Sequence, residues 1–200
     1  MLIGLFLALI ILYVILALFM ARLKPEVALL ANAEARREVT SAIDAAIADE
    51  VRLGELTYDN LVGISTDAAG NVTALVTDMA TINTLQVRIS GAVEAHILTS
   101  MNSKMTIPLG NLSGNVMFSN RGPQIPVKIK SIVDISSQFT NEFTSVGINQ
   151  TRHKIMLEVT AVIDILIPGN TTRATVTKNI AVAETIIVGN VPNVYAGGQG

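Results

Sequence analysis

The residue types best suited to chemistry in this chain are two histidines and scattered carboxylates. His96 and His153 are the only imidazoles, and there is no cysteine. A catalytic zinc site takes three protein ligands, and no HExxH-like spacing brings these histidines together. We therefore predict no metal site. We expect His96, which lies beside the apolar stripe of a helical segment, to serve the fold.

Motifs for covalent catalysis and for cofactor binding are missing as well. The sequence contains no G-x-S-x-G elbow and no glycine-rich phosphate loop followed by Lys-Ser/Thr. Glycoside hydrolysis needs two carboxylates across a cleft, and the candidates are Glu142, Glu158 and Glu184. We predict no catalytic residue, no cofactor and no small-molecule substrate. A module that binds or hydrolyses peptidoglycan is the alternative.

Two polar segments are candidate contact sites for a partner. The first is a loop between two strand signals, and its side chains offer many donors and acceptors: Asn149, Gln150, Thr151, Arg152 and His153. A competing interpretation is a turn whose side chains bond back to the backbone. The second is a long loop after Pro108. Its spaced glycines and prolines predict an ordered conformation, and the candidates there are Gly110, Asn111, Gly122 and Pro123.

The amino-acid composition excludes several classes of protein. The 200 residues are 50% hydrophobic and only 15% charged, with a net charge of −2. Soluble domains carry roughly 25% charged residues, so the chain is unusually apolar. Its 14 Lys and Arg residues give no basic field for a phosphate backbone, which argues against nucleic acid as a partner. The absence of cysteine excludes a disulfide scaffold.

Much of the apolar excess lies in the first 21 residues. Residues 1–21 form an unbroken apolar run, and the first charged residue is Arg22. As a helix this run is about 31 Å long, which matches a bilayer core of about 30 Å. We predict a transmembrane anchor, with a cleaved signal peptide as the alternative. Arg22 and Lys24 follow the run, so the positive-inside rule on its own places the remaining chain in the cytoplasm.

The elements that position the candidate residues follow from hydrophobic periodicity. We expect a juxtamembrane stalk helix over residues 22–53, a β-hairpin formed by 61–66 and 71–78, and a core-facing helix over 79–101. The stalk helix should restart at Pro25 and stop at Gly54. Period-two alternation then predicts a short strand at 104–108 and longer strands at 127–136, 138–146, 153–166 and 172–187.

These elements define the expected fold class and domains. The class is α+β, with a transmembrane helix first and two further helices on one face of an antiparallel sheet. Residues 1–21 are the anchor and 22–53 the stalk. Residues 54–195 form the α+β domain, and 196–200 form a flexible tail because they have nothing to bury.

Four longer motifs carry a family resemblance. They read IPLGNLSG, GPQIPVKI, NEFTSVGINQTRHKIMLEV and IAVAETIIVGNVPNVY, and the likeness extends over roughly residues 24–195. Together they resemble the YunB family of sporulation proteins from endospore-forming Firmicutes.

The resemblance implies a single-pass protein of the mother-cell membrane that contributes to spore formation without catalytic activity. Family members usually carry a short basic cytoplasmic segment before the span. That segment implies an extracytoplasmic domain, opposite to the charge rule, and we follow the family on this point. The expected partners are the membrane, through residues 1–21, and other sporulation proteins or a second copy of the chain.

Overall fold

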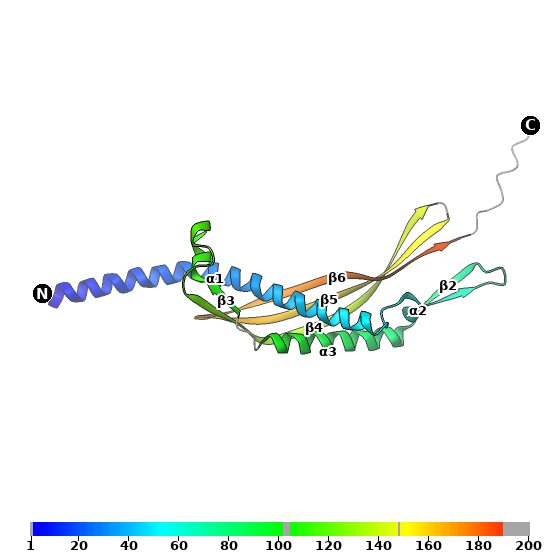
Figure 1. Cartoon of the computed structure of the whole chain (residues 1–200), viewed down its shortest axis with the longest axis horizontal. Coiled ribbons are helices and arrows are strands. Elements are labelled where there is room, and N and C mark those ends of the chain that lie inside the picture. The colour runs from blue at the N-terminus through cyan, green and yellow to red at the C-terminus, as the bar shows by residue number, and fades with distance from the viewer. Residues whose placement is uncertain (1, 102–104, 148, 190–200) are drawn as a thin grey trace, which may run out of the picture. The chain divides into compact units, whose positions relative to one another are not determined.

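The computed structural model describes residues 2–101, 105–147 and 149–189, which form helices followed by a sheet (Figure 1). In chain order the elements are α1 (Leu2–Arg52), α2 (Tyr58–Leu61), β1 (Val62–Thr66), β2 (Val72–Thr77), α3 (Met79–Met101), β3 (Met105–Pro108), the 3₁₀ helices η1 (Leu109–Ser113) and η2 (Val116–Phe118), β4 (Gln124–Gly147), β5 (Gln150–Ile167) and β6 (Asn170–Val188). The predicted α+β class is confirmed. The predicted tail, 196–200, lies outside the described residues.

The strands form two sheets. β1 and β2 are an antiparallel hairpin, as predicted, and the other four strands are hydrogen-bonded in the order β3-β4-β5-β6. β3 pairs antiparallel with the start of β4, from Met105 opposite Val127 to Pro108 opposite Gln124. β5 and β6 follow each other through a tight turn at Pro168 and Gly169, where Gly169 takes a φ of 76° that other residues rarely adopt.

The chain divides into two compact units, and its long elements contribute residues to both. Unit 1 consists of residues 1–39, 98–133 and 162–175. Its core is aliphatic, because α1 presents a small-residue stripe at four-residue spacing and the strands present every second side chain. The buried members are Val27, Ala31, Ala35, Val39, Met105, Ile107, Val127, Ile129, Ile163, Ile165, Ile167 and Ala174.

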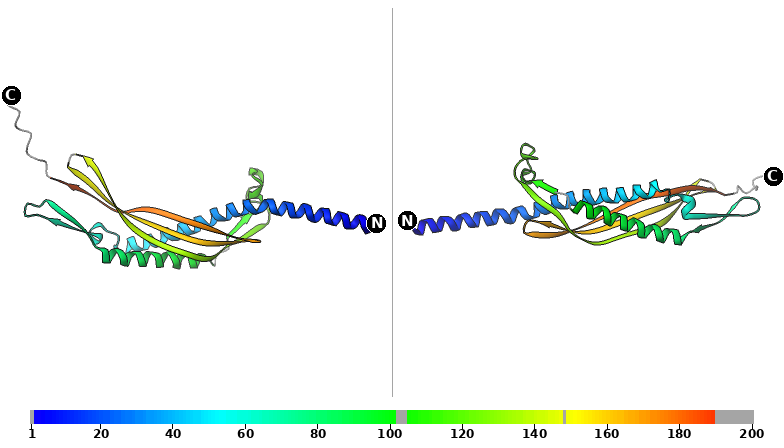
Figure 2. Two further views of the ribbon diagram at one scale, coloured as in Figure 1. Left: turned by 180° about the vertical axis from the view of Figure 1, so that it is seen from behind. Right: turned by 60° about the horizontal axis from the view of Figure 1, so that its bottom comes forward.

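Unit 2 consists of residues 40–97, 134–161 and 176–200. Here the end of α1 and α3 lie on the same face of the sheet (Figures 1 and 2). The α3 stripe is buried as predicted at Ile82, Leu85, Ile89, Val93 and Ile97. The predicted alternation of β5 is confirmed too, with Ile155, Leu157, Val159 and Ala161 fully buried in this unit.

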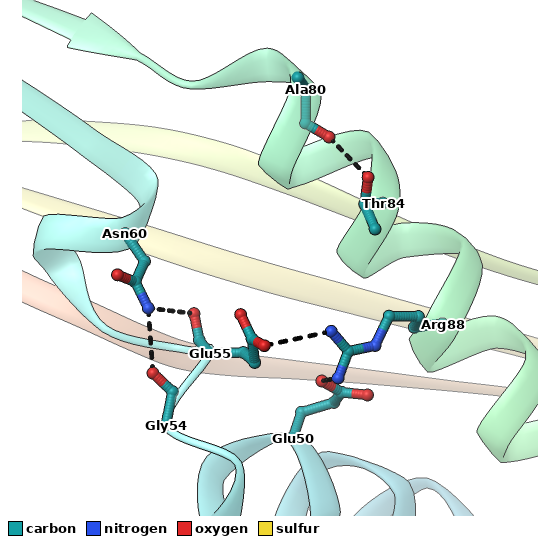
Figure 3. Close-up of polar contacts among 7 residues, drawn as sticks. All are labelled: Glu50, Gly54, Glu55, Asn60, Ala80, Thr84 and Arg88. Atoms are coloured by element: carbon teal, nitrogen blue, oxygen red, sulfur yellow. Dashed lines mark hydrogen bonds and ion pairs between the residues drawn. The ribbon is translucent and has the colours of Figure 1, made fainter.

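Arg88 joins the two helices of unit 2 through a pair of carboxylates (Figure 3). Its Nη2 lies 2.8 Å from Oε2 of Glu50, a residue of α1 that is only 5% exposed. Its Nη1 lies 3.4 Å from Oε1 of Glu55, in the link between α1 and α2. Asn60 of α2 donates through Nδ2 to the carbonyl of Gly54, in that link, at 3.0 Å. The guanidinium therefore joins α3 to the end of α1 and to the following link by two ion pairs.

The helix boundaries differ from the prediction at Pro25. We expected a new helix to start there, but α1 continues from Leu2 to Arg52 with Pro25 inside it. A proline removes one intrahelical hydrogen bond and crowds the preceding turn, and the apolar and alanine-rich segments on both sides keep the helix going. The stop was correct: Gly54 follows the helix with a φ of 73°.

The strand boundaries differ at the centre of β4. The predicted strands 127–136 and 138–146 form one continuous strand, because Ser137 between them does not interrupt it. Ser137 Oγ donates to the carbonyl of Gln86 at 2.8 Å and lies 2.9 Å from Ser90 Oγ, both on α3. The polar break in the pattern is thus a hydrogen-bonded contact between sheet and helix.

The hairpin β1-β2 presents its apolar residues outward. Val72, Ala74 and Val76 on β2 are exposed, as is Ile64 on the partner strand. Asp67 holds the turn: its carboxylate accepts from Asn71 Nδ2 at 2.9 Å and from the backbone N–H groups of Asn71 and Ala69 at 2.8 and 2.9 Å, and these bonds lower the pKa of the carboxyl.

The predicted membrane anchor is not confirmed by the structure. Residues 1–21 lie almost wholly within the helical α1. Among the residues whose side chains are described, no helix is long and apolar enough to cross a membrane.

Candidate contact loop

The segment between β3 and β4 is the most elaborate loop of unit 1, and it contains η1 and η2. Two backbone bonds close its base: Leu109 N–H donates to Pro123 O at 2.9 Å, and Gly110 N–H donates to Arg121 O at 2.8 Å. We call residues 108–123 the η loop. The closed base makes the η loop an extension of the β3-β4 ladder, so its tip is held in one place.

Two asparagines fasten the inside of the η loop. Asn111 Oδ1 accepts from the backbone N–H of Asn120 at 2.7 Å and from Ser119 Oγ at 3.3 Å. Asn115 Oδ1 accepts from Met117 N–H at 2.9 Å and so caps η2. Asn111 was predicted as a partner contact, and its carbonyl oxygen instead organises the loop itself.

The two predicted glycines have backbone roles. A Cβ built on Gly110 would overlap the carbonyl oxygen of Phe118 and lie 2.6 Å from that of Arg121, so only glycine fits there. Gly122 has a φ of 94°, which side chains disfavour. Pro123 supplies the carbonyl that closes the base. The predicted residues of this segment therefore shape the loop.

Three adjacent residues that the η loop exposes are apolar, and the sequence prediction missed them. Val116 is 90% exposed, Met117 76% and Phe118 56%. Exposing three adjacent apolar side chains to water costs free energy. Exposed apolar patches of this kind mark sites of contact with another apolar surface. The available signal was the run Val-Met-Phe between two polar stretches.

The other predicted loop is shorter than expected. β4 ends at Gly147 and β5 starts at Gln150, so Thr151, Arg152 and His153 belong to a strand. Asn149 takes a φ of 59°, and its carbonyl accepts from Gly189 N–H at 2.7 Å. Asn149 and Gln150 are exposed, Thr151 and Arg152 are half-buried, and His153 is 1% exposed. The placement of His153 in an open loop was therefore wrong.

His153 sits in a closed polar cluster of unit 2. Its Nδ1 lies 2.7 Å from the hydroxyl of Tyr58 and its Nε2 lies 3.0 Å from Oδ1 of Asn141. The ring stacks on Phe143 at 4.3 Å between centroids, with 4° between the planes. A neutral imidazole with its proton on Nε2 satisfies both bonds, since Nδ1 then accepts from the Tyr58 hydroxyl.

Electrostatics agree with a neutral imidazole. Burial lowers the pKa of His153 below its ordinary 6.5, and burial followed by the charge of Asp59 raises the pKa of Tyr58. Both groups are therefore neutral near pH 7. Since both ring nitrogens have partners, this cluster suits a structural role better than proton transfer.

The remaining candidates for chemistry are dispersed in unit 2. His96 lies 3.2 Å from Asp49 through Nε2 and Oδ2, which joins α3 to α1. Glu142, Glu158 and Glu184 are exposed on three different strands, and Glu184 lies 3.6 Å from Lys154 Nζ. Within the described residues, no group of three or more His, Cys, Asp or Glu side chains could hold a metal ion.

The fold and the η loop define an α+β protein that carries a long N-terminal helix and a displayed apolar loop. The sequence profile of the family "Sporulation protein YunB" matches residues 104–194. The "Sporulation protein YunB" of Bacillus subtilis (strain 168) is 27% identical over 188 residues, which are 89% of this chain and 74% of that protein. The resemblance to the YunB family is thus confirmed, and it includes the η loop. No solved structure matches the chain.

Proposed function

We propose that this chain is a single-pass membrane protein that contributes to endospore formation as a structural or interaction protein. The observation that carries the proposal is the similarity to sporulation protein YunB, which extends over 89% of the chain. The family match at residues 104–194 takes in β4, β5, β6 and the η loop. The shared part is therefore the scaffold and its loop, which supports a common role.

The membrane anchor is proposed from residues 1–21. They carry no charge, and α1 is helical from Leu2 onward. A helix of this length matches the hydrocarbon core of a bilayer. The domain then lies outside the cytoplasm and the anchor lies in the mother-cell membrane. This is the orientation that the family resemblance implies.

A non-enzymatic role is supported by what the two histidines do. His153 bonds to Tyr58 and Asn141, and His96 pairs with Asp49, so both imidazoles connect elements of the fold. The competing proposal, a peptidoglycan-binding or -hydrolysing module, depends on Glu142, Glu158 and Glu184. Their exposure leaves them available to a polymer, so this alternative is part of the test.

The test is deletion of the gene in its sporulating host, followed by complementation. We expect fewer heat-resistant spores in the deletion strain and full restoration by the intact chain. A triple variant, Glu142→Gln, Glu158→Gln and Glu184→Gln, should restore spores equally well, because a scaffold does not need these carboxylates. Normal spore counts after deletion would overturn the role in sporulation. A triple variant that reaches the membrane and fails to complement would favour the wall enzyme.

A further inference from the structure

We propose that the tip of the η loop, formed by Val116, Met117 and Phe118, inserts into the surface of a lipid bilayer with anionic headgroups. The inference rests on the proposed membrane anchor and adds a second contact with the same membrane. It assigns a role to three adjacent exposed apolar residues of one loop.

The first argument is that the tip is built to be displayed. The hydrogen bonds of Asn111 and Asn115 run inward, and the glycine at 110 lets the chain pass close to the Phe118 carbonyl. A loop fastened this way cannot fold its apolar side chains back under itself. Partial burial of Phe and Met in the interfacial layer recovers the free energy that water contact costs.

The second argument is position within unit 1. Figures 1 and 2 show the η loop beside α1, where the first part of the helix extends past the loop. That first part contains the proposed anchor, residues 1–21. The headgroup layer on each side of a bilayer is roughly 5–8 Å thick, and a helix rises 1.5 Å per residue. The turn of α1 after the anchor therefore lies at headgroup level, and so does the loop beside it.

The third argument is charge. From Ala95 to Val133 the chain has four basic residues, Lys104, Arg121, Lys128 and Lys130, and no acidic one. Arg121, Lys128 and Lys130 are exposed in unit 1. A juxtamembrane basic segment is attracted to anionic lipid at about 1 kcal/mol per residue. Arg121 lies in the η loop itself, whereas Lys128 and Lys130 lie along β4 and the charge of Lys130 acts on Asp164. An apolar tip with a cation in the same loop fits an anionic lipid surface better than the face of a protein partner.

The chain has no tryptophan, so a single introduced indole reports on the tip alone. The experiment places Phe118→Trp in the full chain and reconstitutes it in vesicles of phosphatidylglycerol and phosphatidylcholine. Emission is recorded with and without lipids brominated near the headgroup. We expect a blue shift and several-fold stronger quenching than for the control Ile64→Trp, an exposed position of the β1-β2 hairpin near acidic Asp67. Vesicles without the anionic lipid should give weaker quenching.

Separate readouts keep the two proposals apart. Flotation of the full chain with the vesicles tests the anchor. A chain that floats while position 118 is quenched no more than position 64 overturns the tip insertion and leaves the anchor standing. A blue shift without bromine quenching means that protein covers the tip, and this also overturns it. If Phe118→Trp loses its helical circular dichroism, Met117→Trp, which is more exposed, takes its place.

Discussion

The η loop and the β4-β5 turn are similar in sequence and opposite in structure. Both are rich in Gly and Asn and lie next to strands, and both were predicted as partner contacts. In the η loop Asn111 and Asn115 bond to the loop's own backbone while Val116 and Phe118 are exposed, whereas the turn exposes Asn149 and the strand that follows it buries His153. Polarity along the chain therefore does not locate the displayed surface. The difference predicts that substitutions around His153 cost stability and that substitutions at the η tip cost membrane contact.

The largest loss of stability is expected for Arg88→Met. Removing the guanidinium leaves Glu50 buried without its partner, and breaking a buried ion pair costs about 3 kcal/mol or more. Urea unfolding of the full chain in detergent micelles measures this. The matched control Arg52→Met breaks an exposed pair with Asp49 and should change stability by less than about 1 kcal/mol. Equal losses of unfolding free energy in Arg88→Met and Arg52→Met would show that Arg88 does not compensate the buried charge of Glu50.

His153→Ala should cost about 2–4 kcal/mol, since it opens a cavity under Phe143 and leaves the Tyr58 hydroxyl without its acceptor. The same unfolding experiment applies. His96→Ala, which removes only a half-exposed pair with Asp49, is the control and should stay below about 1 kcal/mol. Tip quenching at position 118 should not change in either variant. A loss of quenching in His153→Ala would contradict the view that the region of His153 serves stability and the η tip serves membrane contact.

Gly110→Ala should open the η loop at a cost of about 1–3 kcal/mol, because its Cβ overlaps the Phe118 carbonyl. Hydrogen exchange should rise at Asn120 and Met117, whose amides the loop holds. Gly91→Ala is the control, since nothing lies within 4 Å of its Cβ in the middle of α3. That change should stabilise the helix by about 0.5–1 kcal/mol. If Gly110→Ala and Gly91→Ala changed the free energy of unfolding in the same direction, that would argue against the close approach of the Phe118 carbonyl to Gly110.

Acid should weaken unit 2 through His153. Its pKa lies below 6.5 in the folded chain, so on acidification the unfolded imidazole binds a proton first. The free energy of unfolding is then constant above about pH 7 and falls below about pH 6.5, by at most about 1.4 kcal/mol per unit. Urea unfolding between about pH 7.5 and about pH 5 measures the slope, and His153→Gln should flatten it. An unchanged slope would assign the effect to another group.

The smallest effect on stability is expected at the η tip. Val116→Ser together with Met117→Ser replaces exposed side chains, so the free energy of unfolding should change by about 0.5 kcal/mol or less. In the Phe118→Trp chain the same pair should remove most of the bromine quenching. A clear loss of stability would mean that these side chains pack within the fold.

Periodicity predicted the elements wherever one face of an element is buried. α3 and its stripe from Ile82 to Ile97 were correct, as was the alternation of β5, because burial forces a 3.6- or 2-residue repeat. Ser137 was misinterpreted as a break, since its bond to Gln86 comes from an element far away in sequence. The partners of His153, Tyr58 and Asn141, were hidden for the same reason.

The η loop shows a different limit. Gly110, Asn111, Gly122 and Pro123 were predicted as partner contacts, and the structure shows what they do for the loop's own backbone. Their function could not be predicted, since the bonds that turn Asn111 inward depend on the closed loop. The exposed Val-Met-Phe run resembled a short core segment, and only its exposure in the folded chain distinguishes the two.

The most direct test of the central claim uses the absence of cysteine, because single thiols can be introduced at Val76 and at Met117, both exposed in the structure. Protoplasts expressing Val76→Cys or Met117→Cys are treated with a membrane-impermeant maleimide before and after detergent. We predict immediate labelling at position 76 without lysis, and labelling at position 117 only after detergent, since a thiol in the bilayer surface meets little water. Equal, rapid labelling at both positions would contradict the insertion of the η loop, and labelling at position 76 only after lysis would contradict the extracytoplasmic domain.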